Sequence, residues 1–270
     1  MKREFMFEGE PANAPAPSVL IDIVFPGDTN HHGTLFGGGG LARMDRVAFI
    51  AATRFGRVPF VTASCERVDF RQPARMGEII RFTARPVWAG TRSLTVAVTM
   101  EAECLSTGDN HLCTSGIFHM VALPGQERPD DWLLPRLSEG EEPGDEPDTL
   151  RMVELVFPDQ ANSYGRMFGG EALAAMTKAA FVMASRHSRQ LTVLASSERV
   201  DFRQSIEVGS IVEVVARVAD VGRSSMRIDT QLWSEELLSG RRCLTAEGRF
   251  AMVAVDPAGR PVPVIPRDVG

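Results

Sequence analysis

Cysteine is scarce in this sequence. The 270 residues include four cysteines, and none of them lies in C-x-x-C spacing. Zinc sites and disulfide frameworks usually place cysteines in pairs at short intervals, so neither is predicted. We expect free thiols, buried as small apolar groups in a reducing compartment. The five histidines form no H-x-x-x-H pattern and no carboxylate cluster, so no metal site is predicted either.

Long apolar runs and an excess of positive charge are also missing. No apolar run reaches the ~18 residues that a membrane-spanning helix needs, and the N-terminal stretch has no apolar segment typical of a signal peptide. We therefore expect a cytoplasmic protein with no membrane partner. The net charge of -6 gives no reason to expect a nucleic-acid partner. Residues 124–148 hold nine acidic residues against two Arg, and the nearly neutral remainder still allows basic pockets for an anionic ligand.

The chain contains one unit twice. "SCERVDFRQ" (64–72) recurs as "SSERVDFRQ" (196–204), and "VFPGDTNHHGTLFGG" (24–38) recurs as "VFPDQANSYGRMFGG" (156–170). Both pairs lie 132 residues apart, and a constant offset of this length indicates a duplicated domain. We predict a first domain over 1–123 with an N-terminal extension, an acidic Pro-rich linker over 124–149 and a second domain over 150–270. The linker contains Trp132, Leu133 and Leu134, so part of it is expected to pack on the body.

Each copy shows the same order of elements. Apolar residues at helical spacing predict buried helices over 38–55 and 170–186. Period-two alternation predicts strands over 18–25, 60–71, 78–88, 92–104 and 111–123, and over 151–157, 191–203, 210–220, 224–236 and 242–255. One long helix against an antiparallel sheet, present twice, gives an α+β protein in which each sheet curls around its helix.

The order N-x-x-G-x-x-F-G-G, then a helix with M-D, then a V-D-F strand before a Gly resembles the acyl-CoA thioesterases of the hotdog fold. The tandem arrangement is similar to that of the eukaryotic cytosolic acyl-CoA hydrolases, and each unit is similar to small bacterial acyl-CoA thioesterases. The resemblance covers residues 18–123 and 150–255. It implies a double hotdog and an acyl-CoA thioester hydrolase that uses no cofactor. Related enzymes commonly assemble three such pairs, which implies a homotrimer.

The residues themselves suit this chemistry. Thioester hydrolysis needs an activated water or a nucleophile, and donors for the developing oxyanion. Gly37 and Gly169 stand where helices begin, so their N–H groups lack intrahelical acceptors, although Gly-Gly also permits close packing. Asp45 lies on a largely apolar helix, where a carboxylate is costly unless it is used or satisfied. It is predicted to be a general base or nucleophile, and the alternatives are a solvated Asp near the helix start or an ion pair with Arg43 or Arg46.

In the resembled family two hotdog units pair and the active sites lie between them. The carboxylate and a strand hydroxyl come from one unit, and the Asn and helix-start Gly come from the other. Transferred to this sequence, the competent site consists of Asp45, Ser64, Asn162 and Gly169. The second site consists of Thr177, Ser196, Asn30 and Gly37. It has no carboxylate, so it is predicted to be degenerate unless Thr177 positions a water. The alternatives are that the two Asn are turn residues and the two Ser are ordinary strand hydroxyls.

The CoA phosphates need cationic contacts. The candidates lie at the start of the strand that follows a Gly turn in each copy, and they are Arg92, Ser93, Arg223 and Ser224. Arg71 and Arg203 are weaker candidates. The alternative for each arginine is a solvated surface residue. Phe36, Phe168, Met44 and Met176 line the acyl tunnel or belong to the core.

Two other functions use the same fold. One is a non-catalytic acyl-CoA binding protein that has kept the groove. The other is a hydratase or dehydratase with an Asp and a His on the loop. "GDTNHHG" approaches D-x-N-P-x-H, but it lacks the Pro, His32 falls one position short, and "DQANSYG" has no His.

Overall fold

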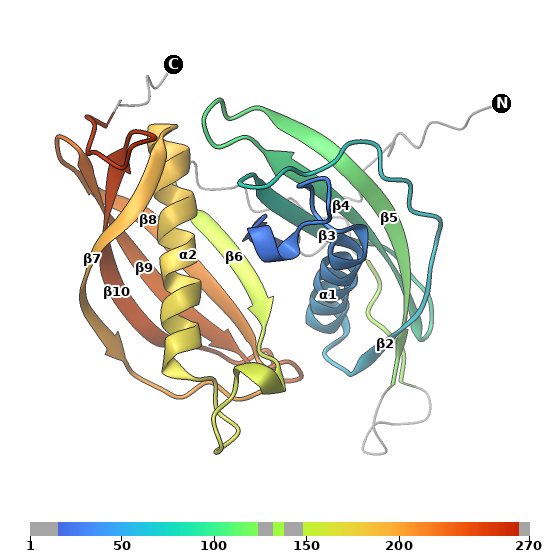
Figure 1. Ribbon diagram of the computed structural model, residues 1–270. Helices are drawn as coiled ribbons and strands as arrows, with labels where there is room; N and C mark the ends of the chain where they lie inside the picture. Colours follow the sequence, from blue (N-terminus) through green and yellow to red (C-terminus); the bar gives the residue numbers. More distant parts are fainter. Residues whose placement is uncertain (1–15, 124–131, 138–147, 265–270) are drawn as a thin grey trace.

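Two five-stranded antiparallel sheets, each curled around one long helix, make up the computed structural model of the chain (Figure 1). The structure describes residues 16–123, 132–137 and 148–264. The strand orders are β1-β3-β4-β5-β2 and β6-β8-β9-β10-β7, so the two sheets have the same topology. This is the predicted double hotdog. Most of the predicted linker over 124–149 lies outside the described residues.

The element bounds repeat with the 132-residue offset of the sequence. The first unit contains β1 (Ser18–Ile23), η1 (Pro26–Asp28), α1 (Gly37–Gly56), β2 (Phe60–Cys65), β3 (Ile79–Ala89), β4 (Ser93–Glu103) and β5 (Asn110–Ala122). The second contains β6 (Leu150–Leu155), η2 (Pro158–Gln160), α2 (Gly169–Ser188), β7 (Leu191–Phe202), β8 (Ile211–Val221), β9 (Ser225–Glu235) and β10 (Arg242–Val255). Neither helix is long and apolar enough to cross a membrane, and these are the only two α-helices in the described ranges.

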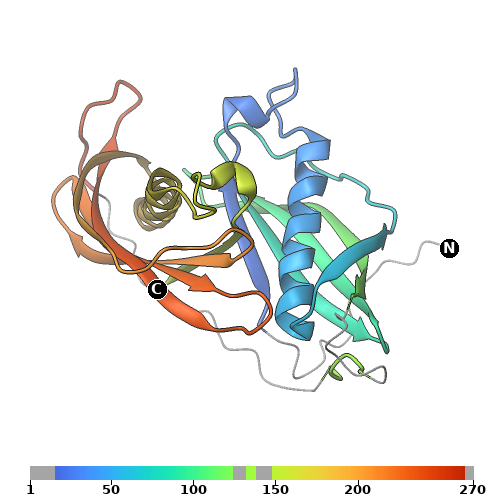
Figure 2. The ribbon, with the colours of Figure 1, turned by 90° about the horizontal axis from the view of Figure 1, so that it is seen from below.

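Each helix is buried by the concave face of its own sheet. Met44 and Val47 of α1 are fully buried, and Met176 and Ala179 of α2 are their counterparts in the second core. Figure 2 shows α2 end-on and α1 side-on, so the two helices are steeply inclined to each other. Because most sides of each helix are covered, few of its positions remain for polar groups.

Two details of the first unit differ from the prediction. The strand expected over 60–71 ends at Cys65, because the chain leaves the β2–β5 ladder after this residue. The backbone N–H of Arg71 still donates to the Cys113 carbonyl at 2.8 Å.

The expectation of buried cysteines was wrong for Cys65, which is exposed on β2 at the edge of the sheet, whereas Cys113 is buried. All four cysteines are free.

Part of the linker packs on the first unit, as expected. Leu134 is buried in the first core, and its N–H donates to the Thr91 carbonyl at 2.9 Å. Trp132 is half-buried against the same core, and Leu133 is exposed.

The two units meet along β1 and β6, which lie side by side. Ion pairs across this boundary occur in equivalent sets, one in each half. They are Arg46–Glu154 with Lys178–Asp22, and Arg54–Glu235 and Arg57–Glu235 with Arg186–Glu103 and Arg189–Glu103. The repeat therefore builds a pseudo-twofold boundary held at both ends by one carboxylate between two arginines.

The helix C-caps belong to these clusters. Arg57 and Arg189 adopt left-handed conformations with φ of 50° and 52°, where glycine is favoured. Each arginine side chain reaches a carboxylate of the other unit, which accounts for the absence of glycine. The facing turns make room: a Cβ on Gly108 would lie 2.5 Å from Arg189 Cζ, and one on Gly240 would lie 2.8 Å from Arg57 Cζ.

Candidate active site

Asp45 lies half-buried in the middle of α1 and is held by a hydroxyl group. Thr62 Oγ1 of β2 donates to its Oδ1 at 2.6 Å. The neighbouring arginines pair elsewhere: Arg43 contacts Asp22 at 3.1 Å and Asp28 at 2.8 Å, and Arg46 contacts Glu154 at 3.0 Å. The alternative of a local ion pair with Arg43 or Arg46 is therefore not found. The carboxylate is oriented without being neutralised by a cation, which suits a base.

Thr62 is the residue that sequence reasoning missed. The strand hydroxyl predicted there, Ser64, was expected to bond the water beside the carboxylate, and that role stays a prediction. The β2–β5 register shifts between Thr62 and Ser64, and the hydrogen bond to Asp45 itself comes from Thr62. Ser64 is exposed. The sequence did contain a signal for Thr62, because Thr62 and Asp45 both change between the two copies. Thr62 is replaced by Leu194, and Asp45 is replaced by Thr177. The carboxylate and its hydroxyl partner are thus both absent from the second unit.

The two loop asparagines differ in what their amide groups contact. The side-chain oxygen of each accepts backbone N–H bonds within its own turn, from His32 in one copy and Tyr164 in the other, so the turn role is real. Asn30 Nδ2 donates to Thr34 Oγ1 at 3.0 Å. Position 166 of the second copy is Arg, and no described residue accepts from Asn162 Nδ2. The amide group of Asn162 is therefore available to a ligand, whereas one of the two N–H donors of the Asn30 amide is bonded to Thr34.

The two helix starts also differ, in that the second has more open space around its glycine than the first. A Cβ on Gly37 would lie 3.8 Å from the Phe70 ring, whereas one on Gly169 would meet no atom within 4 Å. Gly169 lines an open groove of about 340 Å³ together with Phe202 and Arg203. The structure thus brings the predicted oxyanion donor and one predicted CoA-binding arginine to a single groove. Arg203 itself pairs with Glu247.

The other CoA candidates occupy the tight turns between β3 and β4 and between β8 and β9. Arg92 and Arg223 are exposed, and Ser93 and Ser224 are half-buried. In the described part of the chain, none of them contacts Asp45, Asn162 or Gly169 by a recorded hydrogen bond. Arg71 and Ser196 are exposed, with no recorded side-chain contact to the site.

The four tunnel candidates divide into two pairs. Met44 and Met176 are fully buried and belong to the two cores. Phe36 and Phe168, the residues before the helices, are 61% and 59% exposed. Only the phenylalanines therefore remain candidates for contact with a ligand.

Contacts across the boundary connect Arg46, the neighbour of Asp45, to the opposite loop. The guanidinium of Arg46, the residue after Asp45, lies 4.4 Å from the ring centroid of Phe157, which begins η2. The carbonyl of Gln160, at the end of η2, accepts from the N–H of Phe168 at 2.8 Å. One short path thus links the middle of α1 to the segment that carries Asn162 and Gly169.

Comparison with known proteins agrees with this arrangement. The sequence profile of the thioesterase superfamily matches residues 32–112 and 164–240, once in each unit. A crystal structure of an acyl-CoA hydrolase from Agrobacterium tumefaciens superposes with a TM-score of 0.84 at 66% identity, covering 92% of this chain and 98% of that one. The cytosolic acyl coenzyme A thioester hydrolase of Rattus norvegicus is 24% identical over 90% of this chain and 75% of its own length. An uncharacterised acyl-CoA thioester hydrolase of Bacillus subtilis (strain 168) is 39% identical over 41% of this chain and 64% of its own length.

Proposed function

Because the chain belongs to the thioesterase superfamily, we propose that it hydrolyses acyl-CoA to a free fatty acid and CoA, with one competent site between its two units. The observation that carries the proposal is the hydrogen bond of Thr62 to Asp45, since neither residue has a counterpart in the second unit. Asn162 and Gly169 complete this site: no described residue accepts from the Asn162 side-chain amide, and Gly169 borders an open groove. Thr177, Ser196, Asn30 and Gly37 form the degenerate one.

In the proposed reaction Asp45 accepts a proton from water as the water attacks the thioester carbonyl, or attacks that carbonyl itself. Thr62 holds the carboxylate in place for either step. The Asn162 amide and the Gly169 N–H donate to the oxyanion, where preorganised donors have their largest effect. Collapse of the tetrahedral intermediate breaks the C–S bond, and the CoA thiolate takes up the proton that Asp45 accepted from water. If Asp45 attacks directly, the collapse leaves an acyl anhydride on its carboxylate and a CoA thiolate that is protonated by solvent. Water then hydrolyses the anhydride, which releases the fatty acid and restores Asp45. No step uses a cofactor.

The hydratase alternative is disfavoured by the loop geometry. His32 is exposed, and its ring lies tilted by 45° against that of His31, with centroids 3.9 Å apart. Its backbone N–H is tied into the Asn30 turn. The loop of the second unit offers no histidine in its place.

The test of the proposed function is CoA release from a panel of acyl-CoA thioesters, followed with a thiol-detecting reagent. We expect turnover of at least one chain length by the wild-type protein. Binding of acyl-CoA without any CoA release across the panel would make this a non-catalytic binding protein and overturn the proposal.

The two loop asparagines provide a matched pair of variants. We expect Asn162→Ala to lower kcat by roughly 10- to 100-fold, because it removes an open donor at the oxyanion. Asn30→Ala is expected to leave kcat within about twofold, since its amide is already bonded to Thr34. Steady-state kinetics of the two purified variants make the comparison. Equal losses would contradict the assignment of the competent site to Asn162.

We also propose that three chains assemble in the cytoplasm. Exposed apolar side chains lie at the helix starts and on β2 and β7, and include Phe36, Val61, Phe168 and Leu194. Exposed apolar surface of this kind favours association. Light scattering after gel filtration should give three times the chain mass of 29.5 kDa. A monomeric mass at micromolar concentration would contradict this proposal.

A further inference from the structure

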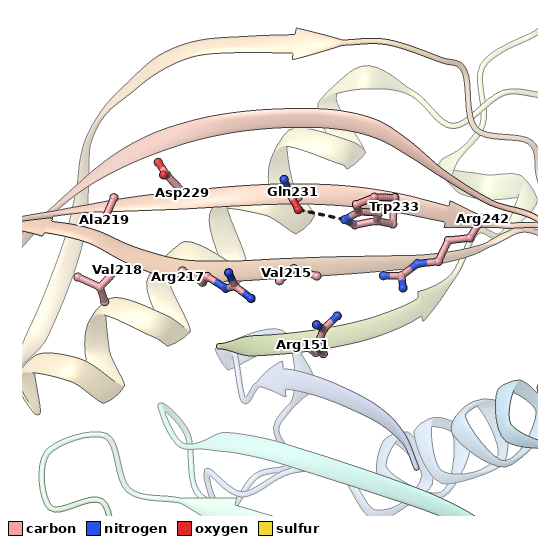
Figure 3. A pocket seen from close by; sticks show the side chains of 9 residues that line it. All are labelled: Arg151, Val215, Arg217, Val218, Ala219, Asp229, Gln231, Trp233 and Arg242. Atoms are coloured by element: carbon pink, nitrogen blue, oxygen red, sulfur yellow. Dashed lines mark hydrogen bonds between the residues drawn. The ribbon is translucent and has the colours of Figure 1, made fainter. Parts of the chain in front are cut away.

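A second groove lies on the outer face of the second sheet, away from α2 (Figure 3). Its volume is about 460 Å³, and its lining comes from β6, β8, β9 and β10. Met226, Ile228 and Leu232 of β9 belong to the core around α2. Side chains alternate along a strand, so Asp229, Gln231 and Trp233 of β9 face the opposite way, into this groove.

Three guanidinium groups converge on the groove from three strands. They belong to Arg151 of β6, Arg217 of β8 and Arg242 of β10. Arg151 and Arg242 share a single carboxylate, that of Glu213, which has only 12% of its side chain exposed. A guanidinium has five N–H donors, so two arginines on one carboxylate retain donors for an anion. Arg217 is placed by Thr149, which accepts from its Nε at 2.9 Å.

An aromatic ring with a defined orientation lies beside these arginines. Trp233 Nε1 donates to Gln231 Oε1 at 3.3 Å, and the Arg242 guanidinium covers the ring at 4.8 Å from its centroid. A ring held by a hydrogen bond and a cation can accept a planar group by stacking at little entropic cost.

The first sheet lacks most of the residues that give this groove its character. The positions that correspond to Arg151, Arg242 and Trp233 are Val19, Asn110 and Glu101. Only Arg217 has a basic counterpart there, Arg85. The convergence of guanidinium groups and an indole is thus specific to one of two otherwise equivalent sheets, so the common fold does not require it.

We propose that this groove binds the adenosine diphosphate group, either of a free nucleotide or of CoA. The phosphates lie among Arg151, Arg217 and Arg242, and the base stacks at Trp233. Bidentate guanidinium contacts suit phosphate oxygens, and the volume is within the range of small-molecule sites. The site lies on the sheet face opposite α2, so it is separate from the proposed catalytic site.

The experiment uses a full-length Trp88→Phe, Trp132→Phe variant, in which Trp233 is the only tryptophan. We expect saturable quenching of its fluorescence by ADP or by CoA. The Arg217→Ala change is expected to weaken binding about tenfold, as for loss of a charge-assisted hydrogen bond. Arg85→Ala, the matched change in the first sheet, should leave binding unchanged. Quenching by ADP identifies a free nucleotide as a ligand, and quenching by CoA alone identifies the CoA nucleotide.

Three results would overturn the proposal. One is the absence of quenching by either ligand at millimolar concentration, with no binding heat by calorimetry of the wild-type protein. Another is an equal loss of affinity in the Arg85→Ala and Arg217→Ala variants. The third is inorganic pyrophosphate binding as tightly as ADP, which would leave no role for Trp233. None of these readouts depends on hydrolysis, so failure here is distinguishable from failure of the proposed activity.

Discussion

Asp45→Asn is expected to lower kcat by roughly a hundredfold to ten-thousandfold, because it removes the carboxylate proposed as the base or nucleophile. Asparagine has the same size and can still accept the hydrogen bond from Thr62, so the fold and the binding of acyl-CoA should be kept. A loss confined to the chemical step lowers kcat and kcat/KM together. Steady-state CoA release and thermal unfolding, measured on the same preparation, separate this result from a folding defect.

The matched control is Thr177→Ala at the equivalent position of α2. Thr177 has neither a carboxylate nor a hydroxyl opposite it, since position 194 is Leu. We expect kcat to stay within about twofold of the wild-type value, as is usual for a partly exposed position without a special role. Hydrolysis by Asp45→Asn at a near wild-type rate, or a comparable loss in Thr177→Ala, would move the chemistry away from Asp45.

Placing a carboxylate at position 177 tests whether the opposite half of the second site, Asn30 and Gly37, can support hydrolysis. In the Asp45→Asn background, Thr177→Asp with Leu194→Thr rebuilds the carboxylate and its hydroxyl partner on α2 and β7. The opposite half would still be Asn30, bonded to Thr34, and Gly37, in contact with Phe70. We therefore expect little recovery of activity. Such a result would mean that the proposed degeneracy of the second site involves both units, and not the loss of one carboxylate alone.

The fold could be predicted from the sequence because the duplication supplied an internal comparison. Every strand and helix was expected close to its observed position, since each pattern occurs twice at one offset. The exceptions are local. The V-D-F segment has the pattern of a strand in both copies. Only the segment of the second copy, residues 200–202, lies in a strand, which is β7. In the first copy β2 ends at Cys65, and no property of the residues near Val68 distinguishes the two cases.

The candidate site was predicted less completely, because the two copies differ in what their shared motif residues contact, and a motif does not show contacts. A motif shows that Asn30 and Asn162 are both present, but not that Thr34 occupies one amide. Nor does it show that Phe70 covers Gly37. Thr62 was within reach, because its replacement by Leu194 parallels that of Asp45 by Thr177. Comparing the two copies position by position, rather than only where they agree, would have identified it.

Glu235→Ala is expected to destabilise the protein by about 3 kcal/mol. Glu235 has 9% of its side chain exposed and holds Arg54 and Arg57 of the other unit, both at 2.7 Å. Its removal leaves two partly buried guanidinium groups without their carboxylate, and we take the lower end of the usual range because Arg57 is 34% exposed. For a chain of this size the melting temperature should fall by roughly 6–12 °C. Differential scanning calorimetry measures the shift.

The neighbouring residue provides the control, and pH provides a second readout. Glu236 is exposed and pairs with Arg241 on its own loop, so Glu236→Ala should change stability by less than about 0.5 kcal/mol. Burial opposes ionisation of Glu235, but Arg54 and Arg57 outweigh it and hold its pKa below the ordinary value of 4.5. A carboxyl with a lowered pKa stabilises the fold above its ordinary pKa, and this contribution is lost as the pH falls through the lowered one. The stability gap between wild type and Glu235→Ala should therefore be widest near neutral pH and narrow below 4.5. A gap that is absent at neutral pH would mean that the clusters contribute nothing to the union of the two units.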